Sequence, residues 1–393
     1  MLIHRPFGRG PMRVGIDYRP ALQNREGIGR YARELVRAMV ELDFDRNLGL
    51  FGYTLAPMRF SRQELGIAGS HAELLRLRLP SRWLPGLLQR LGRGADDLVG
   101  GATVFHHTQP NLLPVREAVE VATIFDTIYM LDCGYLDPES AERMTRAARE
   151  QVRRAARILV PTQFVGAEVV MGLGAAPGRV TVTELGCDHA VRNLPPEGYG
   201  PATDPFILTV SRVDARKNHL RMLAAFERLV KEGLPQRWII AGPAGYGSEL
   251  FEQALADSPV RERVDWLRLV PEAELTRLYC QADLFLFASL NEGFGLPPLE
   301  AMALGTPVVS SAVTSMPEVL GDAAILVEPT DPERIFEAAR RLLTEPDLAA
   351  ELAGKGKARA RQFTWRECAK RTLLAYQNAT RDEGEEPKLR HSL

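Results

Sequence analysis

The sequence predicts two α/β domains, each built on a doubly wound parallel sheet, and three observations support this prediction. Short apolar segments alternate with amphipathic helical segments in both halves of the chain. At 393 residues the chain is longer than a single hydrophobic core usually serves. A stretch rich in Pro, Gly and acidic residues, 192–204, separates the halves without an apolar period. We therefore expect domains at 12–195 and 203–364.

In the first half, short apolar runs predict strands and one amphipathic run predicts the leading helix. The expected strands are 12–17, 102–107, 120–126, 156–162 and 179–185, and the helix is 27–42. Because short apolar strands that alternate with helices form parallel sheets covered on both faces, these segments predict one layered domain.

The second half repeats this alternation more regularly and predicts a second layered domain. The expected strands are 206–212, 237–243, 264–270, 284–289, 306–311 and 323–329, and the expected helices are 218–232, 248–256, 272–281, 298–304 and 331–344. A last helix is expected over 365–380. We expect flexible tails at 1–11 and 381–393, and Met12 is a possible natural start.

Composition excludes several classes of protein. The formal net charge of −1 gives no field that would recruit nucleic acid. The four cysteines are scattered singly, which fits a reducing cytoplasm and no zinc site. No apolar run approaches the ~18 residues of a membrane span, and the first eleven residues lack the apolar segment of a signal peptide. A cytoplasmic protein is therefore expected.

The segment NEGFGLPPLEAMALGTPVV, 291–309, predicts a ligand site after a buried strand. Its glycines permit close approach of a ligand, and the helix that starts near Pro298 presents free N–H groups to an anion. Glu292 and Glu300 flank this turn and are expected to accept hydrogen bonds from hydroxyl groups. The alternative is that Glu300 is an acidic residue in the first helical turn, stabilised there by the helix dipole alone, and that Glu292 is exposed to solvent.

A second segment, TVSRVDARKNHLRMLAAF, also predicts a site for an anionic ligand. Arg212 ends a strand, and Arg216 and Lys217 directly precede a helix that begins near Asn218. Cations at a helix N-terminus oppose the dipole by ~0.3–1 kcal/mol each, so their presence predicts a polyanion bound between them. A solvated basic loop is the alternative.

These two segments resemble the retaining glycosyltransferases of family 4, which have the GT-B fold of two Rossmann-like domains facing across a cleft. The most specific part is E-x7-E, from Glu292 to Glu300. The segment GIDYRPALQNREGIGRYARELV is similar to the family's N-terminal glycine loop, and FTWRECAKRTLLAY to its closing helix, which crosses back to the first domain. The resemblance covers nearly the whole chain.

The resemblance implies a role for each matching residue. Arg212 and Lys217 would neutralise the donor diphosphate as it leaves, Glu292 would contact the donor sugar and Glu300 the ribose. Asp126 is also counted as catalytic. The remaining residues assigned to donor binding are Gly27, Gly29, Phe125, Gly242, Phe294, Gly295 and Leu296. The chemistry needs no metal or cofactor, because fixed cations and a helix terminus stabilise the leaving group.

One position departs from the family pattern. The family usually has His-Asp where this chain has Phe125-Asp126. Either the donor presents an apolar group, such as the methyl of a 6-deoxyhexose, or the contact has moved to His106 and His107, which we assign to acceptor binding. The alternative for both histidines is a loop or packing role.

Two further segments carry minor predictions. The DFD at 43–45 matches a metal-binding motif only superficially. The segment 74–94 interleaves arginines with leucines and Trp83, which is typical of a surface that contacts an anionic bilayer, although it also fits a helix packed inward.

We expect transfer of a hexose, with mannose or a 6-deoxyhexose favoured, to a glycan or lipid-linked acceptor. This function would place the enzyme in the cytoplasm, at the inner face of the membrane. The alternatives are transfer to a small soluble acceptor, another activity of the same fold such as an epimerase or phosphorylase, and a non-catalytic nucleotide-sugar binder.

Overall fold

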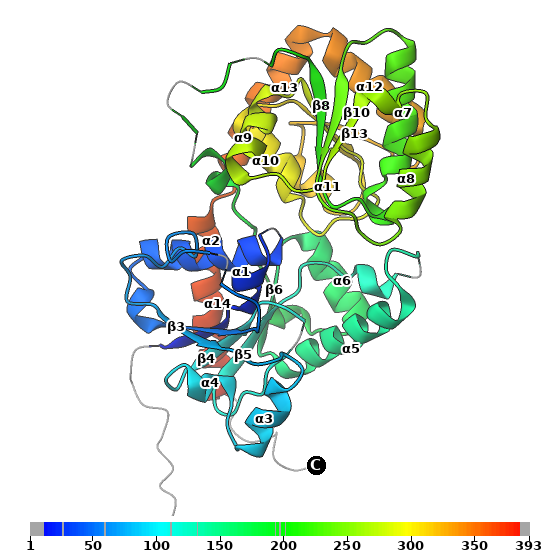
Figure 1. Ribbon diagram of the computed structural model, residues 1–393. Coiled ribbons are helices and arrows are strands. Elements are labelled where there is room, and N and C mark those ends of the chain that lie inside the picture. Colours follow the sequence, from blue (N-terminus) through cyan, green and yellow to red (C-terminus); the bar gives the residue numbers. More distant parts are fainter. Residues whose placement is uncertain are drawn as a thin grey trace, which may run out of the picture.

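The chain forms two layered α/β units, one above the other in Figure 1. The structure is a computed structural model that describes residues 12–385 apart from positions 26, 59, 111, 132, 193, 196, 197 and 201. The predicted tail 1–11 therefore lies outside the described residues, as does 386–393 of the predicted C-terminal tail.

The first unit is a seven-stranded parallel sheet in the order β3-β2-β1-β4-β5-β6-β7. Its strands are β1 Val14–Asp17, β2 Leu48–Tyr53, β3 Glu73–Leu77, β4 Val104–His107, β5 Val119–Thr123, β6 Arg157–Val160 and β7 Val180–Val182. Its helices are α1 Arg19–Gln23, α2 Ile28–Glu41, α3 Leu84–Arg90, α4 Ala95–Leu98, α5 Pro138–Arg154 and α6 Gln163–Leu173, with short 3-10 turns η1 Asp45–Asn47, η2 Ile128–Met130, η3 Pro177–Arg179 and η4 Asp188–Val191.

The second unit is a six-stranded parallel sheet in the order β10-β9-β8-β11-β12-β13. Its strands are β8 Phe206–Val210, β9 Arg237–Ala241, β10 Val264–Leu267, β11 Leu284–Phe287, β12 Val308–Ser311 and β13 Ile325–Val327. Its helices are α7 His219–Lys231, α8 Ser248–Asp257, α9 Glu272–Gln281, α10 Leu296–Leu304, α11 Met316–Leu320, α12 Pro332–Thr344 and α13 Pro346–Ala360, with turns η5 Ala215–Lys217 and η6 Arg261–Arg263.

The last helix, α14 Trp365–Glu385, returns to the first unit, where it packs against α2, β5 and β6; Figure 1 shows it in red beside α2. Trp365 and Tyr376 are fully buried along it, which anchors the return. The flexible tail predicted from 381 is wrong over 381–385, because the helix continues and Asp382 pairs with Arg157.

Two strands of the first sheet, β2 and β3, were not predicted. The strand β2 contains Gly49 and Gly52, which weaken the apolar pattern. A Cβ on Gly49 would lie 2.6 Å from Val99, and one on Gly52 would lie 2.2 Å from Leu22, so both glycines admit close packing. The segment 74–94 is not one amphipathic element, since β3 occupies its start and α3 its later part.

The two units touch where their strands end. Thr162, which precedes α6, donates its hydroxyl to the carbonyl of Gly293 at 3.0 Å. Glu318 of α11 accepts the backbone N–H groups of Gln163 and Phe164 at 2.8 and 3.1 Å, so a carboxylate of one unit caps a helix of the other. Because parallel strands place ligands beyond their carboxyl ends, this junction is the expected site.

Candidate active site

The loop after β11 holds Glu292 by its backbone on both sides. Its N–H donates to the Thr314 hydroxyl at 3.1 Å, and its carbonyl accepts from the Ser315 hydroxyl at 2.8 Å. Thr314 has φ 56°, in the left-handed region that β-branched residues avoid. Such strain persists only where the surroundings hold it, and it is typical of functional loops. Glu292 is therefore fixed before any ligand arrives.

The Glu292 side chain, only 7% exposed as a residue, is held by two cations. Lys217 Nζ lies 2.5 Å from its Oε1, and Arg216 Nη1 lies 3.0 Å from its Oε2. The Ser289 hydroxyl donates to Oε1 as well. Burial alone would raise the pKa of Glu292, but Arg216 and Lys217 outweigh it and lower the pKa to about 2. The carboxylate is ionised at any physiological pH.

The two cations come from η5, which Asn218 fixes at the start of α7. Asn218 has φ 64°, and its side-chain amide donates to the carbonyls of Ala288 and Pro329 at 2.8 and 2.7 Å. Burial, followed by repulsion from Arg216, lowers the pKa of Lys217 despite the neighbouring carboxylate. The two cations therefore lie largely buried at the carboxyl edge of the sheet.

Arg212, predicted as the second phosphate ligand, is exposed at the end of β8. Its side chain lies over Gly245, where a Cβ would approach Arg212 Cδ to 2.6 Å. Among the residues that the structure describes, no hydrogen bond or ion pair to Arg212 is present. The guanidinium is therefore free to turn toward an anion, while Lys217 is already engaged.

Phe125 and Asp126, at the end of β5, come from the first unit to the same place. An ideal Cβ on Gly293 would lie 1.8 Å from the Phe125 carbonyl oxygen, so the two loops are in backbone contact. The Phe125 ring packs edge-on against Tyr31 with 4.8 Å between centroids. Burial raises the pKa of Asp126, and Arg216 opposes the shift. The structure thus brings Asp126 and Glu292 into one charged cluster.

The start of α10 is buried between the units. Gly295 caps it with φ 93°, and Pro at the first turn needs no N–H partner. Phe294 points away from the charged cluster, because it packs edge-on against Phe363 at 5.8 Å between centroids. Leu296 is half-buried at the first helical position. Any contact of Phe294 with a ligand would therefore use its backbone.

Glu300, also 7% exposed, is held by partners from three other segments. His189 Nε2 donates to its Oε1 at 2.8 Å, and Tyr279 donates to its Oε2 at 2.9 Å. Trp365 donates to His189 Nδ1 at 3.0 Å, which fixes the proton of that ring on Nε2. Burial opposes ionisation, but Arg30 and His189 lower the pKa of Glu300 to about 2.

Arg30 of the first unit belongs to the cluster around Glu300, so this cluster forms a contact between the two units. Arg30 lies on α2, with its Nε 3.9 Å from Glu300 and its Nη1 2.7 Å from Glu272 of α9. Glu300 therefore connects α10 to α2 and η4 of the first unit and, through His189, to Trp365 of α14, in addition to its predicted role toward a ribose.

Of three glycines predicted to bind the donor, two lie in tight places and one lies in an open place. Gly27 starts α2 with φ 55° and has no atom within 4 Å of an ideal Cβ, so its surroundings are open. A Cβ on Gly29 would lie 2.1 Å from the Asn24 carbonyl oxygen. Gly242 has φ 147°, and its Cβ would lie 2.1 Å from the Ser211 carbonyl oxygen. Gly29 and Gly242 therefore serve backbone packing, and Gly27 alone faces space.

His106 and His107 do not fit the acceptor role predicted for them. Both are fully buried within β4. His106 bonds to Thr123 and Tyr376, at 2.7 Å each, and His107 Nε2 lies 2.8 Å from Glu120. The alternative, a packing role, describes their position, because neither ring has surface to offer an acceptor.

Several residues of both clusters are not among the site residues that the sequence predicts. The sequence indicated an anion near Arg216, which precedes a helix, but the resemblance assigned a role only to Arg212 and Lys217. Arg30, His189 and Tyr279 give no local signal, because they converge on Glu300 from distant segments. The DFD at 43–45 does not belong to a metal site in the structure. In the described part of the chain, no three or more His, Cys, Asp or Glu side chains are grouped so that they could hold a metal ion.

Comparisons of the sequence with known proteins identify the family of this chain. A family model described as "Glycosyl transferases group 1" matches residues 194–359, which include Glu292 and Glu300. The O-antigen chain mannosyltransferase B of Escherichia coli is 30% identical over 364 residues, covering 89% of this chain and 95% of that relative. The chain is a group 1 glycosyltransferase. A D-inositol 3-phosphate glycosyltransferase of Nocardioides sp. is 31% identical over 266 residues, covering 62% of this glycosyltransferase and 57% of the relative.

Solved structures show the fold of this glycosyltransferase. Sucrose-phosphate synthase from Thermosynechococcus elongatus aligns with a TM-score of 0.73 at 18% identity, covering 94% of this chain and all of that one. Anabaena Alr3699/HepE in complex with UDP and glucose aligns with a TM-score of 0.70 at 14% identity, covering 93% of this chain and all of that one. The predicted GT-B fold is therefore confirmed. Within the described residues, no helix combines the length and apolar character that crossing a bilayer requires.

Proposed function

We propose that this glycosyltransferase moves a hexose from a nucleotide-diphosphate sugar to a saccharide or lipid-linked acceptor. Transfer would retain the anomeric configuration and need no metal, as in family 4. The observation that carries the proposal is the buried group of Arg216, Lys217 and Glu292 beside the free Arg212, at the carboxyl edge of the second sheet. Fixed cations at that edge suit a diphosphate better than any uncharged ligand.

The proposed chemistry assigns each charge a task. The bond between the sugar C1 and the diphosphate oxygen breaks, and its electron pair stays on the diphosphate. Arg212, Lys217 and the N-terminus of α10 stabilise that charge. The acceptor oxygen bonds to C1 on the same face, and its proton passes to the departing phosphate oxygen. Glu292 orients the two cations and accepts hydrogen bonds from the sugar, with Asp126 beside it.

Mannose is the favoured sugar, because a relative that spans most of this chain is named a mannosyltransferase. A 6-deoxyhexose is the second candidate. The Phe125 ring, held against Tyr31, offers an apolar wall where a histidine would offer a polar one. Faster turnover of GDP-mannose or UDP-glucose than of 6-deoxy donors would exclude that second candidate.

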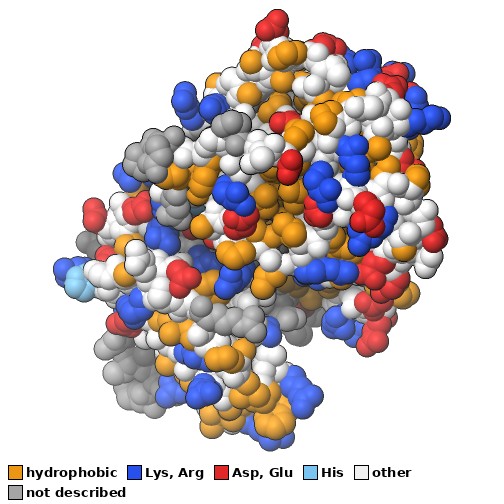
Figure 2. All heavy atoms as spheres, turned by 45° about the horizontal axis from the view of Figure 1, so that its top comes forward, with side chains coloured by type: hydrophobic (Ala, Val, Ile, Leu, Met, Phe, Trp, Pro, Cys, Tyr) orange, Lys and Arg blue, Asp and Glu red, His pale blue; other side chains and the backbone are white. Residues whose placement is uncertain are grey.

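Contact with a membrane surface is proposed for α3. Trp83 is 59% and Leu91 63% exposed, with Leu87 exposed between them, while Arg82, Arg90 and Arg93 surround them. In Figure 1 α3 lies at the lower end of the molecule, and Figure 2 shows hydrophobic and basic side chains gathered at that end. Apolar side chains framed by cations suit an anionic bilayer surface, which would place the enzyme at the cytoplasmic face.

Transfer to a small soluble acceptor is the second candidate function. It is favoured by the similarity to relatives named D-inositol 3-phosphate glycosyltransferases.

The test is a panel of UDP, GDP, ADP and dTDP sugars, scored by release of the nucleotide with and without saccharide acceptors. We expect one donor to release its nucleotide slowly alone and faster with acceptor, in the presence of a chelator. The absence of release from every donor would contradict the proposal.

A further inference from the structure

A hollow of about 700 Å³ opens on the first unit, between the ends of strands β1, β2, β3 and β4 and the helices α3 and α5. Four arginines from three segments line it: Arg19 after β1, Arg82 before α3, and Arg143 and Arg146 on α5. The same wall contains a single carboxylate, Glu150. Because like charges repel, four guanidinium groups around one space are unfavourable unless an anion separates them.

Carboxylates outside the arginine hollow act on three of its arginines: Asp17 on Arg19, Asp137 on Arg143 and Glu142 on Arg146. Glu150 binds Arg153, outside the hollow, through two hydrogen bonds of 2.5 and 2.8 Å. Arg146 contacts Glu142 at 2.7 Å, but both side chains are about three-quarters exposed, so water screens this pair. Arg19 lies over the Tyr53 ring at 5.2 Å, and its buried Nε has no hydrogen-bond partner among the described residues.

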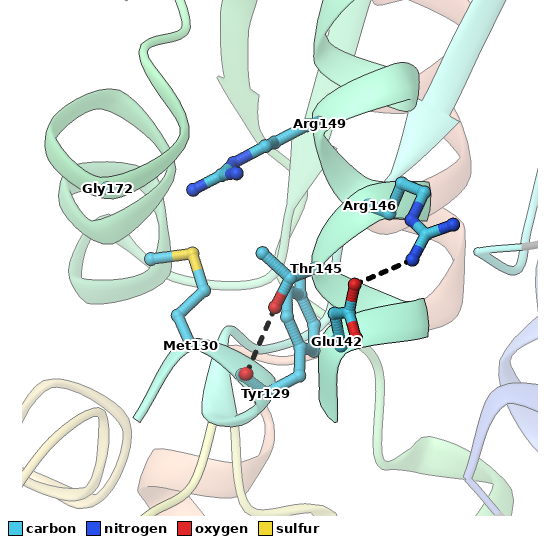
Figure 3. A pocket seen from close by; sticks show the side chains of 7 residues that line it. All are labelled: Tyr129, Met130, Glu142, Thr145, Arg146, Arg149 and Gly172. Atoms are coloured by element: carbon cyan, nitrogen blue, oxygen red, sulfur yellow. Dashed lines mark hydrogen bonds and ion pairs between the residues drawn. The ribbon is translucent and has the colours of Figure 1, made fainter. Parts of the chain in front are cut away.

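A second, smaller hollow of about 470 Å³ continues along α5. Arg146 lines both, and Figure 3 shows Arg149 reaching across the smaller one toward α6 while Arg146 turns to Glu142. Arg143, Arg146 and Arg149 are spaced by three residues, so they form one stripe on a helical face. The stripe extends the positive surface beyond a single phosphate position.

The remaining wall of the arginine hollow is mostly apolar, with Ser81 and Tyr53 as its polar members. Leu112, Leu113, Pro85 and Pro110 contribute to it. Pro85 belongs to α3, whose exposed Trp83 and Leu87 lie within two residues of it. The hollow therefore combines cations with apolar contacts and opens beside the surface that we propose for the membrane.

Strand order places the hollow near the reaction site but not in it. Its lining residues lie at or after the ends of β1, β2, β3 and β4 and on α5, while Asp126 lies directly after β5. Since β4 alone separates β1 from β5, their carboxyl ends are about 10 Å apart. A molecule that fills the hollow can extend along this edge and present a hydroxyl near Asp126 and Glu292.

We propose that the arginine hollow binds a phosphate group of the acceptor, remote from the hydroxyl that receives the sugar. Arginines that converge from α5, β1 and α3 match the several oxygens of a phosphate ester, and the apolar wall takes the group esterified to it. This inference rests on the proposed function. The phosphate belongs either to a lipid-linked saccharide or to a soluble sugar phosphate.

The experiment measures binding by calorimetry with the nucleotide site saturated by a nucleoside diphosphate. The probes are octyl phosphate, glucose 1-phosphate and octyl glucoside, which lacks the phosphate. The variants are Arg143→Gln/Arg146→Gln and, separately, Arg82→Gln; the matched control is Arg334→Gln/Arg341→Gln, which removes two exposed arginines of α12. Thermal unfolding shows that each variant is folded.

We expect both phosphates to bind the wild type and the control equally, and to bind the α5 double variant about tenfold more weakly or worse. Tighter binding of octyl phosphate identifies the lipid-linked source, and tighter binding of glucose 1-phosphate the soluble one. Phosphate affinities unchanged in both variants, or octyl glucoside bound as tightly as octyl phosphate, would overturn the inference. Because binding is scored without turnover, a missing transferase activity would contradict the proposed function alone.

Discussion

Glu292 and Glu300 lie eight residues apart, are equally buried and are both strongly ionised, yet their partners differ in kind. The partners of Glu292 are Arg216 and Lys217, which precede a helix of the same unit. Those of Glu300 include Arg30 of the other unit, and its carboxylate joins segments that are far apart in the sequence. One carboxylate therefore organises charge at a ligand site, and the other also connects the two units.

This difference shows why equal burial does not imply equal function. A buried carboxylate needs compensating partners wherever it lies. At Glu292 two cations hold the carboxylate at the edge where we propose that the leaving diphosphate lies, and the nearby carboxylates of Asp126 and Asp214 also act on Arg216. At Glu300 a histidine, a tyrosine and an arginine satisfy the carboxylate. We therefore expect removal of this charge to lower the stability of the fold and of the contact between units more than it lowers catalysis.

Among single substitutions at the site, Glu292→Gln should give the largest effect. The amide keeps the shape but leaves Arg216 and Lys217 without their anion, so both cations lose their fixed positions. We expect kcat to fall about 100-fold, the scale of losing one transition-state contact. Steady-state nucleotide release with acceptor measures this. A kcat within threefold of the wild type would contradict the role of Glu292.

Gly293→Ala should give an intermediate effect. Its Cβ would meet the Phe125 carbonyl oxygen at 1.8 Å, so the two loops must separate. We expect kcat/KM to fall about tenfold, because a small misplacement of the reacting groups lowers the rate steeply. The control is Gly354→Ala in α13, whose Cβ meets nothing within 4 Å. Equal activity of the two variants would contradict a tight junction.

Glu300→Gln should lower stability more than catalysis. Loss of the charge weakens the contacts with His189 and Arg30, and we expect about 2–3 kcal/mol less free energy of unfolding at pH 7. Urea denaturation at fixed pH measures it. A loss of kcat as large as that of Glu292→Gln, with stability unchanged, would reverse the assignment of the two carboxylates.

The loss of stability in Glu300→Gln should depend on pH. The folded-state pKa of Glu300, about 2, lies below the ordinary 4.5, so its stabilisation is present above pH 4.5 and is lost as the pH falls toward 2. The stability difference between wild type and Glu300→Gln should therefore shrink as the pH is lowered from 4.5 to 3. A difference independent of pH would mean that ionisation of Glu300 contributes nothing.

Local signals predicted the second unit well. Pro298, Gly305 and the apolar run before Ser289 marked the strand, loop and helix around Glu292, and α10 begins only two residues before the predicted start. Cations before α7 indicated an anion site for a reason visible in sequence alone, since they oppose the helix dipole.

Features of the structure that depend on packing between distant segments could not be predicted from the sequence. The glycines of β2 disguise a strand, because what they accommodate, Val99 and Leu22, lies elsewhere in the chain. The sequence assigned His106 and His107 to the acceptor, but both rings are buried, with Tyr376 of α14 on Nδ1 of His106 and Glu120 of β5 on Nε2 of His107. The partners of Glu300 likewise meet only after both units fold together.

The central claim is that a nucleoside diphosphate leaving group is held by Arg212 and Lys217. The most direct measurement compares the transfer rate and nucleoside diphosphate affinity of Arg212→Ala/Lys217→Ala with those of Arg334→Ala/Arg341→Ala, which removes two exposed arginines elsewhere. We expect the first pair to lose about 1,000-fold in transfer and to bind the nucleotide weakly, while the second pair changes neither. Transfer at the wild-type rate in the first pair would contradict the claim.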